Sequence, residues 1–146
     1  MSDFIDDKPT MTFWFVGGAA LIWNLLGMAV YYMTVSATPE QLAAQYSADQ
    51  IAIIENTPVW ATSAFAIAVT AGVLGSLLLL LRKVWAIPVF IVSLAAALVQ
   101  NVNTFVLTDS IAVFGMTPVY IQSAIIVIGI FLIFYSRSAK RQGWLI

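Results

Sequence analysis

Four long apolar segments constrain the fold of this chain more than any other feature. They span about Met11–Met33, Pro58–Leu81, Val84–Leu107 and Thr117–Tyr135, and none of them contains Asp, Glu, Lys or Arg. A helix of about 20 mostly apolar residues is long enough to cross the hydrocarbon core of a bilayer. Only 9% of all residues are charged, whereas a soluble domain has about 25%, so this chain cannot cover a water-exposed surface. We therefore predict an all-α integral membrane protein, with residues 1–146 forming one domain folded as a four-transmembrane-helix bundle.

The charged residues are sorted to the two sides of such a bundle. With four spans, one side carries every basic residue: Lys8, Arg82, Lys83, Arg137, Lys140 and Arg141. The opposite side carries four acidic residues and no basic one: Glu40, Asp49, Glu55 and Asp109. Loops rich in Lys and Arg stay on the cytoplasmic side of a membrane. We therefore expect a multi-pass membrane protein with both termini in the cytoplasm.

Aromatic residues are expected at both membrane interfaces, where the rings of Trp and Tyr are favoured. The inner set is Trp14, Trp85, Tyr135 and Trp144, and the outer set is Tyr31, Tyr32, Trp60 and Tyr120.

The segment between the first two spans is the only long loop on the expected outer side. Thr38-Pro-Glu-Gln and Ser47-Ala-Asp-Gln each place a hydroxyl residue three positions before a glutamine, which is the capping-box pattern of a helix start. We expect two short helices there. Two interpretations are open, because such helices can connect the spans along the membrane surface or cover the mouth of the bundle as a lid.

The second span carries a stripe of small residues, one at every fourth position: Ala64, Ala68, Gly72 and Ser76. Small residues let helix backbones approach closely in lipid. We expect this span to be the most buried helix, and we expect the stripe to serve as the contact in a homo-oligomer.

Neutral polar side chains gather in the outer half of the expected bundle, beside aromatic rings. The candidate ligand-binding set is Asn24, Gln100, Asn101 and Gln122 with Trp23 and Trp60. Amides and rings together can hold a neutral, sugar-like solute or a quinone head group in an outward-facing cup. The other interpretation is that the amides only bond across helices, for example Asn24 to Gln100 or Gln122. Asn103 and Thr104 are expected to be hydrated, because they approach the outer headgroups.

The residues that the chain lacks exclude several functions. There is no cysteine and no histidine, which excludes Cys/His metal sites and thiol or Ser-His-Asp chemistry. The spans hold no Asp, Glu, Lys or Arg, and such a residue at membrane depth usually marks a proton-coupled carrier. We therefore predict no enzyme activity and no cofactor. Six scattered basic residues with a net charge of -1 also argue against a nucleic-acid partner.

Several short motifs along the chain carry a family resemblance. They are Trp23-Asn24-x-x-Gly27, Gly72-x-x-Gly75, Trp85-Ala-x-Pro88-x-Phe90-x-x-Ser93 and Gly143-Trp-Leu145. In these motifs the chain resembles a group of small four-span bacterial membrane proteins, frequent in marine bacteria and often left as hypothetical or labelled "sugar transporter". The resemblance covers nearly the whole chain apart from the outer loop and Ser2–Pro9. It implies the four-span fold, a location in the bacterial inner (cytoplasmic) membrane and the transport of a sugar, and it assigns no site residues.

Two hypotheses on function follow, and both include the lipid bilayer as a partner. In the first, the chain binds a neutral polar solute and lets it pass by facilitated transport. In the second, it is a non-enzymatic accessory or structural subunit that packs against a larger membrane protein.

Overall fold

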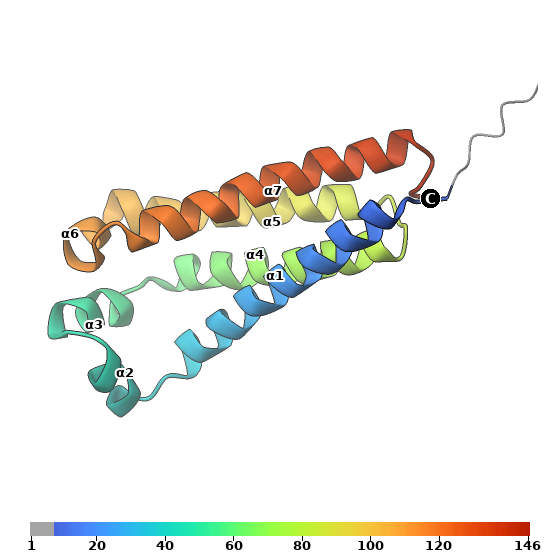
Figure 1. Cartoon of the computed structure of the whole chain (residues 1–146). Helices are drawn as coiled ribbons and strands as arrows, with labels where there is room; N and C mark the ends of the chain where they lie inside the picture. The colour runs from blue at the N-terminus through green and yellow to red at the C-terminus, as the bar shows by residue number, and fades with distance from the viewer. Residues whose placement is uncertain (1–7) are drawn as a thin grey trace, which may run out of the picture.

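The computed structural model describes residues 8–146, and within that range the chain is helical without any strand (Figure 1). In chain order the elements are α1 (Met11–Ser36), α2 (Pro39–Gln45), α3 (Ala48–Glu55), α4 (Val59–Leu80), α5 (Ala86–Val102), the π-helical turn η1 (Asn103–Leu107), α6 (Ser110–Phe114) and α7 (Thr117–Arg141). Four helices are long and apolar enough to cross a membrane: α1, α4, α5 continued through η1, and α7. The prediction of four such helices is confirmed.

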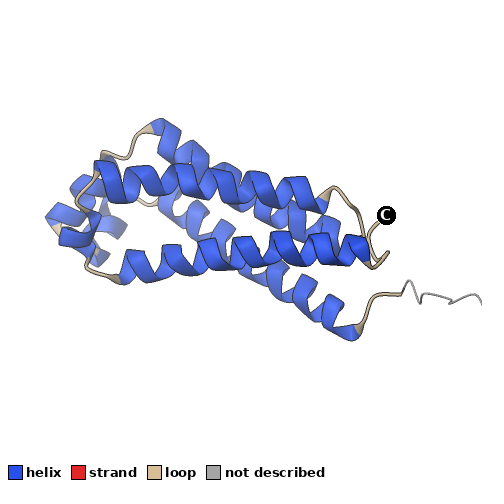
Figure 2. Cartoon of the chain, turned by 90° about the horizontal axis from the view of Figure 1, so that it is seen from above, coloured by secondary structure: helices blue, strands red, loops and turns tan. Residues whose placement is uncertain are grey.

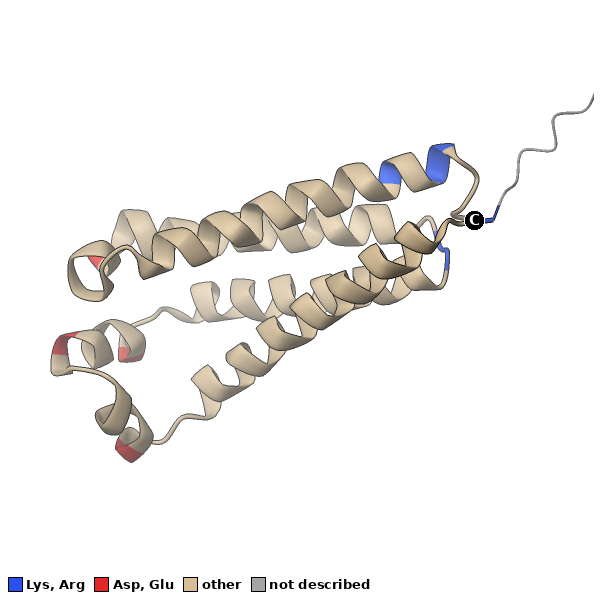
Figure 3. Cartoon of the chain, in the orientation of Figure 1, with Lys and Arg blue, Asp and Glu red and all other residues tan. Residues whose placement is uncertain are grey.

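The two ends of the bundle carry opposite charges (Figure 3). The Lys and Arg residues of the described chain lie where α4 turns into α5, where α7 stops and just before α1. We call this the basic end. The described Asp and Glu residues lie on α2, on α3 and at the start of α6, which we call the acidic end. Figure 2 shows the four long helices running lengthwise, with the short helices gathered at the end away from the C-terminus.

The largest differences between the helix boundaries and the predicted spans lie at the end of α7 and after α5. α7 continues beyond Tyr135 to Arg141, because Arg and Lys end an apolar segment but are good helix formers. After α5, the backbone widens into the π-helical turn η1 and then forms the short helix α6. Hydropathy predicts neither the π-helical turn nor α6, because the composition of this segment also suits a continuous α-helix.

The long helices pack in chain order, α1 on α4, α4 on α5, and α5 on α7. α1 and α4 are antiparallel. A Cβ atom added to Gly17, near the start of α1, would lie 2.6 Å from Cδ2 of Leu80 at the end of α4. Near the other ends, the rings of Tyr31 and Phe65 meet edge to face with centroids 5.2 Å apart. Small residues thus allow the close backbone approach that holds helices together in lipid.

The small-residue stripe of α4 is used inside the monomer. α4 has the largest buried share of the four long helices, as the sequence predicted. The stripe itself, Ala64, Ala68, Gly72 and Ser76, is buried within the single chain, because α1 and α5 both pack on α4. The stripe is thus used for packing within the monomer, and its use as a contact between copies stays a prediction.

Packing at the basic end joins α1 to α7. Phe13 of α1 is fully buried, and its ring lies 6.4 Å from that of Tyr135 and 5.8 Å from that of Trp144. Trp144 was expected at the membrane interface, yet only 9% of it is exposed. The tail turns inward because Gly143 has a positive φ of 77°, which ends α7 in a conformation that glycine adopts readily.

The two short helices α2 and α3 begin with complete capping boxes. Thr38 caps α2 with Gln41, and Ser47 caps α3 with Gln50. Across the acidic end they reach α6, where the rings of Tyr46 and Phe114 lie 6.4 Å apart. Local hydrogen bonding at these helix starts is the reason that this segment is helical despite its short length.

Candidate ligand-binding cavity

A cavity of about 300 Å³ lies between α1 and α7, with α4 and α5 behind it. We call it the α1–α7 cavity. Its nineteen lining residues are Trp23, Asn24, Leu26, Gly27 and Val30 of α1, Phe65, Ala68 and Val69 of α4, Phe90, Ser93, Leu94, Ala97 and Gln100 of α5, and Ile121, Gln122, Ile125, Ile128, Gly129 and Leu132 of α7. Its volume is at the lower end of the range of about 300–1,000 Å³ that is typical of small-molecule sites.

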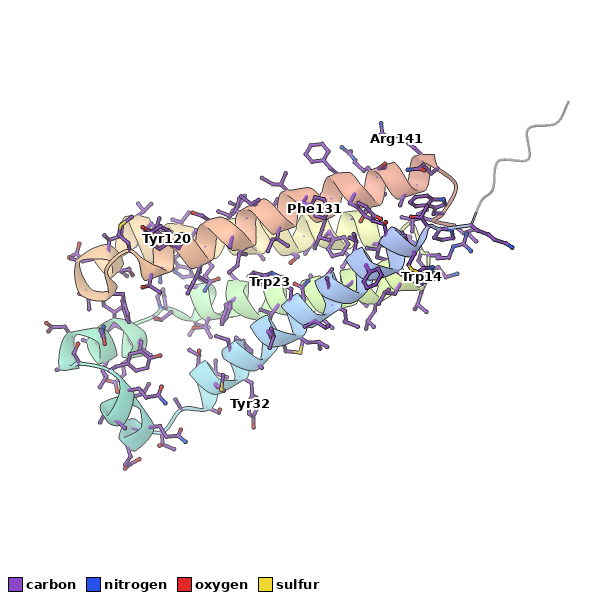
Figure 4. All side chains as sticks on the ribbon, viewed as in Figure 1. Trp14, Trp23, Tyr32, Tyr120, Phe131 and Arg141 are labelled. Carbon is purple, nitrogen blue, oxygen red and sulfur yellow. The ribbon has the colours of Figure 1, made fainter. Side chains whose placement is uncertain are left out.

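The divergence of two helices creates this cavity. α1 and α7 converge at the basic end and separate toward the acidic end (Figure 1). At the inner limit of the cavity, Phe90 and Leu132 are buried and belong to the core cluster that contains Phe13. At its mouth, Leu26 is 60% exposed, and Trp23 lies midway along α1 (Figure 4). The cavity is therefore closed toward the basic end and open between α1 and α7.

Asn24 is held by the protein itself. Its Nδ2 donates to the carbonyl oxygen of Ala20 at 2.8 Å and to Oγ of Ser76 at 3.2 Å. Its Oδ1 lies so close to Gly72 that a Cβ atom there would overlap it. Asn24 thus joins α1 to α4, as the interpretation of amides as interhelical contacts predicts, although its partner is Ser76 and not Gln100 or Gln122.

The two glutamines of the cavity are not joined to each other or to Asn24. Oε1 of Gln122 is buried and has no hydrogen-bond partner among residues 8–146. The Gln100 side chain forms no hydrogen bond within the same residues, and only its main-chain carbonyl accepts one, from Thr104. A buried carbonyl without a partner costs about 1–3 kcal/mol. The interpretation in which the amides of the cavity bond to one another therefore does not describe Gln100 and Gln122.

The hydroxyl group in the cavity wall, that of Ser93, is already paired. Oγ of Ser93 donates to the carbonyl oxygen of Ala68 at 2.6 Å, which ties α5 to α4. Of the four polar residues in the lining, Asn24 and Ser93 serve helix packing, and Gln100 and Gln122 remain for other partners.

The candidate set from the sequence is partly brought together. Trp23, Asn24, Gln100 and Gln122 line the cavity, whereas Asn101 and Trp60 do not. Asn101 follows Gln100 directly, and one residue turns an α-helix by about 100°, so the two amides point to different sides of α5. Its Oδ1 is also buried without a partner. Trp60 lies in the first turn of α4, more than a turn before Phe65, the first α4 residue of the lining.

The end of α5 is less hydrated than expected. Asn103 is buried, although its position near the expected headgroups suggested exposure to water. Oγ1 of Thr104 donates to the Gln100 carbonyl at 3.3 Å, and Oγ1 of Thr108 donates to the carbonyls of Asn103 and Thr104 at 3.1 and 2.9 Å. These hydroxyls satisfy carbonyl groups at the π-helical turn, where regular α-helical bonding ends.

Residues that the sequence reasoning missed form much of the wall. Phe65, Phe90, Leu94 and Ile125 line the cavity, but an apolar residue in a membrane span carries no signal that separates a cavity wall from a lipid-facing surface. Ser93 also lines the cavity, and its hydroxyl group is used to join α5 to α4.

A second space, of about 310 Å³, lies between the end of α1 and α2. Val30 lines both this space and the α1–α7 cavity. The helices α2 and α3 therefore lie next to the cavity mouth, which leaves both interpretations of that segment in place.

The described residues were compared with the arrangement that a metal site needs. Within residues 8–146, no group of three acidic side chains is placed to hold a metal ion.

Comparison of the chain with protein-family models, with curated proteins and with solved structures found no match.

Proposed function

We propose that this chain is a non-enzymatic membrane protein that binds a neutral small molecule in the α1–α7 cavity. One observation carries the proposal: a residue of the cavity wall, Gln122, has a buried carbonyl oxygen without a partner among residues 8–146. A buried unpaired acceptor is costly, and Gln122 differs from Asn101, whose Oδ1 is equally unpaired, because Gln122 lines a cavity that can hold a ligand. A ligand that donates one hydrogen bond to Gln122 removes that cost.

The lining favours a ligand with a mostly apolar body. No charged residue lines the cavity, and fifteen of its nineteen residues are apolar. Among the lining residues, only Gln100 and Gln122 have amide groups that form no hydrogen bond between helices. A sugar would leave several hydroxyl groups unpaired there, at about 1–3 kcal/mol each. A molecule with an apolar body and one or two neutral donors, such as a long-chain alcohol or a hydroquinone, fits better than the polar solute first expected.

The charge distribution supports one orientation. If the basic end faces the cytoplasm of a bacterium, as the positive-inside rule requires, the cavity opens in the outer half of the inner membrane. Facilitated transport of the bound molecule is the wider form of the proposal. Passage would require the Phe13 core at the basic end to separate, so binding is the function that the arrangement supports most directly.

Binding is tested with the full chain in nanodiscs of neutral phosphatidylcholine. The probes are 1-dodecanol, a short-chain hydroquinone and glucose, followed by tryptophan fluorescence and by the unfolding temperature. The matched variants are Gln122→Leu, in the cavity, and Asn101→Leu, which removes an equally unpaired amide outside it. We expect 1-dodecanol or the hydroquinone to bind, and Gln122→Leu to weaken binding about fivefold, the worth of one hydrogen bond of about 1 kcal/mol. Asn101→Leu should bind as the original chain does.

Other outcomes separate the alternatives. Glucose binding that Gln122→Leu abolishes would favour the sugar-like solute. Equal affinity of both variants for every probe would overturn the cavity as a site. Absence of binding together with constant co-purification of a larger membrane protein would instead favour the accessory role.

A further inference from the structure

A groove at the basic end is separate from the α1–α7 cavity. It has a volume of about 560 Å³ and lies between the start of α5 and the last turns of α7. Its lining consists of two apolar and three cationic residues: Ile87, Phe134, Arg137, Lys140 and Arg141. The helix packing and the proposed ligand cavity make no use of these three cations.

The three cations lie on one face of α7, at the end of the bundle away from every described Asp and Glu side chain. Arg137, Lys140 and Arg141 are spaced at i, i+3 and i+4, which places their side chains together. All three are exposed, and none forms an ion pair or side-chain hydrogen bond within residues 8–146. The described acidic residues lie at the opposite end of the bundle (Figure 3). Three like charges within little more than one turn repel one another, and an anion bound between them would relieve that repulsion.

The order of residues along the groove matches the structure of a phospholipid. Phe134 lies one turn before Arg137, is 63% exposed, and belongs to the apolar part of α7. Arg141 projects from the end of that helix (Figure 4). An acyl chain can therefore lie along Phe134 and Ile87 while a phosphate meets the cations at headgroup depth. Arg binds phosphate with two parallel N–H donors, and basic pockets between membrane helices are suited to anionic head groups.

We propose that this groove binds the phosphate group of an anionic phospholipid, with Arg137, Lys140 and Arg141 as its ligands. The phosphate recognition could also be met by free inorganic phosphate, but only a lipid uses the apolar floor formed by Ile87 and Phe134. This inference does not depend on the α1–α7 cavity.

The test compares nanodiscs of phosphatidylcholine alone with nanodiscs that contain phosphatidylglycerol, using the full chain. Native mass spectrometry counts retained lipids, and circular dichroism gives the unfolding temperature. Arg137→Gln combined with Lys140→Gln should lower the affinity for phosphatidylglycerol about 25-fold, or about fivefold per cation. The control is Lys83→Gln, which removes an exposed charge at the same end but outside the groove and should retain the lipid.

Further arms identify the source of the phosphate. Phe134→Ala should weaken retention of phosphatidylglycerol, because the acyl chain loses its contact. Inorganic phosphate added to neutral nanodiscs should give no stabilisation. Equal stabilisation by phosphate, with no effect of Phe134→Ala, would overturn the lipid as ligand. Equal loss of lipid in Lys83→Gln and in the double variant would show attraction by net charge alone and would overturn the groove as a site.

Discussion

The basic end and the acidic end of this bundle are built from the same four long helices but differ in how completely they are closed. At the basic end, Phe13 packs against rings of α7 and of the C-terminal tail. The main chain is tied there as well, because Ile146 N–H donates to the Arg82 carbonyl at 2.7 Å and Val84 N–H donates to the Ile146 carbonyl at 3.1 Å. At the acidic end, α1 and α7 separate (Figure 1), and the cavity between them holds an unpaired amide oxygen.

The difference indicates where binding can be located in a small membrane protein. Lipid removes most of the hydrophobic drive between helices, so close packing and hydrogen bonding hold the bundle together. One well-packed end can keep four helices in register while the other end retains groups that are not satisfied by the protein. Elements that bind and move are drawn from the less stable part of a fold. The predictions below test whether stability is located at the basic end and binding at the acidic end.

The largest effect is expected from Phe13→Ala. Phe13 is fully buried in the core of the basic end, and the loss of such a ring costs about 3–5 kcal/mol in free energy of unfolding. Phe15→Ala is the matched control, because Phe15 lies on the same helix but is 71% exposed. The measurement is unfolding in mixed micelles with increasing dodecyl sulfate, followed by circular dichroism. A cost for Phe15→Ala as large as that for Phe13→Ala would contradict the assignment of the core to this end.

The next effect concerns the approach of α4 to α5. A Cβ atom on Gly75 would lie 2.8 Å from Cδ1 of the buried Phe90, and such overpacking costs about 1–3 kcal/mol. Gly18→Ala is the control, since a Cβ atom there has no neighbour within 4 Å. The control should be as stable as the original chain or more so, because alanine favours a helix by up to about 1 kcal/mol over glycine. Opposite signs for Gly75→Ala and Gly18→Ala in the same unfolding measurement are the expected result.

A third prediction concerns the turn between α4 and α5. Arg82 has a positive φ of 60° and ends α4 as Gly143 ends α7, with Lys83 N–H bonding back to the Leu78 carbonyl at 2.8 Å. Nε of Arg82 also donates to the Trp144 carbonyl at 2.7 Å. Both Arg82→Ala and Arg82→Gly lose that bond with the rest of the arginine side chain, but only Arg82→Ala keeps a φ that is unfavourable for its residue type. We therefore expect Arg82→Gly to be the more stable variant by about 1 kcal/mol; equal stabilities would mean that the turn changes its conformation on substitution.

A smaller loss is expected from Ser76→Ala, which removes one hydrogen-bond partner of Asn24. Interhelical hydrogen bonds in membranes contribute about 0.6 kcal/mol on average. Ser63→Ala on the same helix is the control, because Ser63 is exposed. A double-mutant cycle with Asn24→Ala measures the coupling directly. A coupling energy of zero would show that Asn24 gains its stability from the Ala20 carbonyl alone.

Hydropathy and charge predicted the coarse fold well, because both act over whole segments. The four long helices and the buried position of α4 follow from apolar length and small-residue spacing. The separation of α1 from α7 could not be predicted, since no residue type marks where two lipid-facing helices diverge. The buried position of Trp144 was not predicted, and the sequence placed this residue at the interface. Its inward turn depends on the backbone conformation of Gly143 and on a space beside Phe13, and only the packed bundle defines that space.

The site was predicted in part for a similar reason. Depth along each helix correctly grouped Asn24, Gln100 and Gln122, because depth depends only on residue count. The side of the helix was not predicted, so Asn101 was included although it does not line the cavity. The partner of Asn24 was also missed: Ser76 was regarded as a small packing residue, and its hydroxyl group was given no role.

The smallest effect on stability, with its sign reversed, is expected from Gln122→Leu. Leucine replaces a buried amide oxygen that has no partner within the described residues, so its removal should leave the free energy of unfolding unchanged or raise it by up to about 1 kcal/mol. Asn101→Leu should behave alike in the unfolding measurement, because Oδ1 of Asn101 is equally unpaired. The two variants should differ only in ligand affinity, because Gln122 lines the cavity and Asn101 does not. A large loss of stability in Gln122→Leu alone would mean that this amide holds the acidic end together, and the contrast between a packed end and a binding end would then fail.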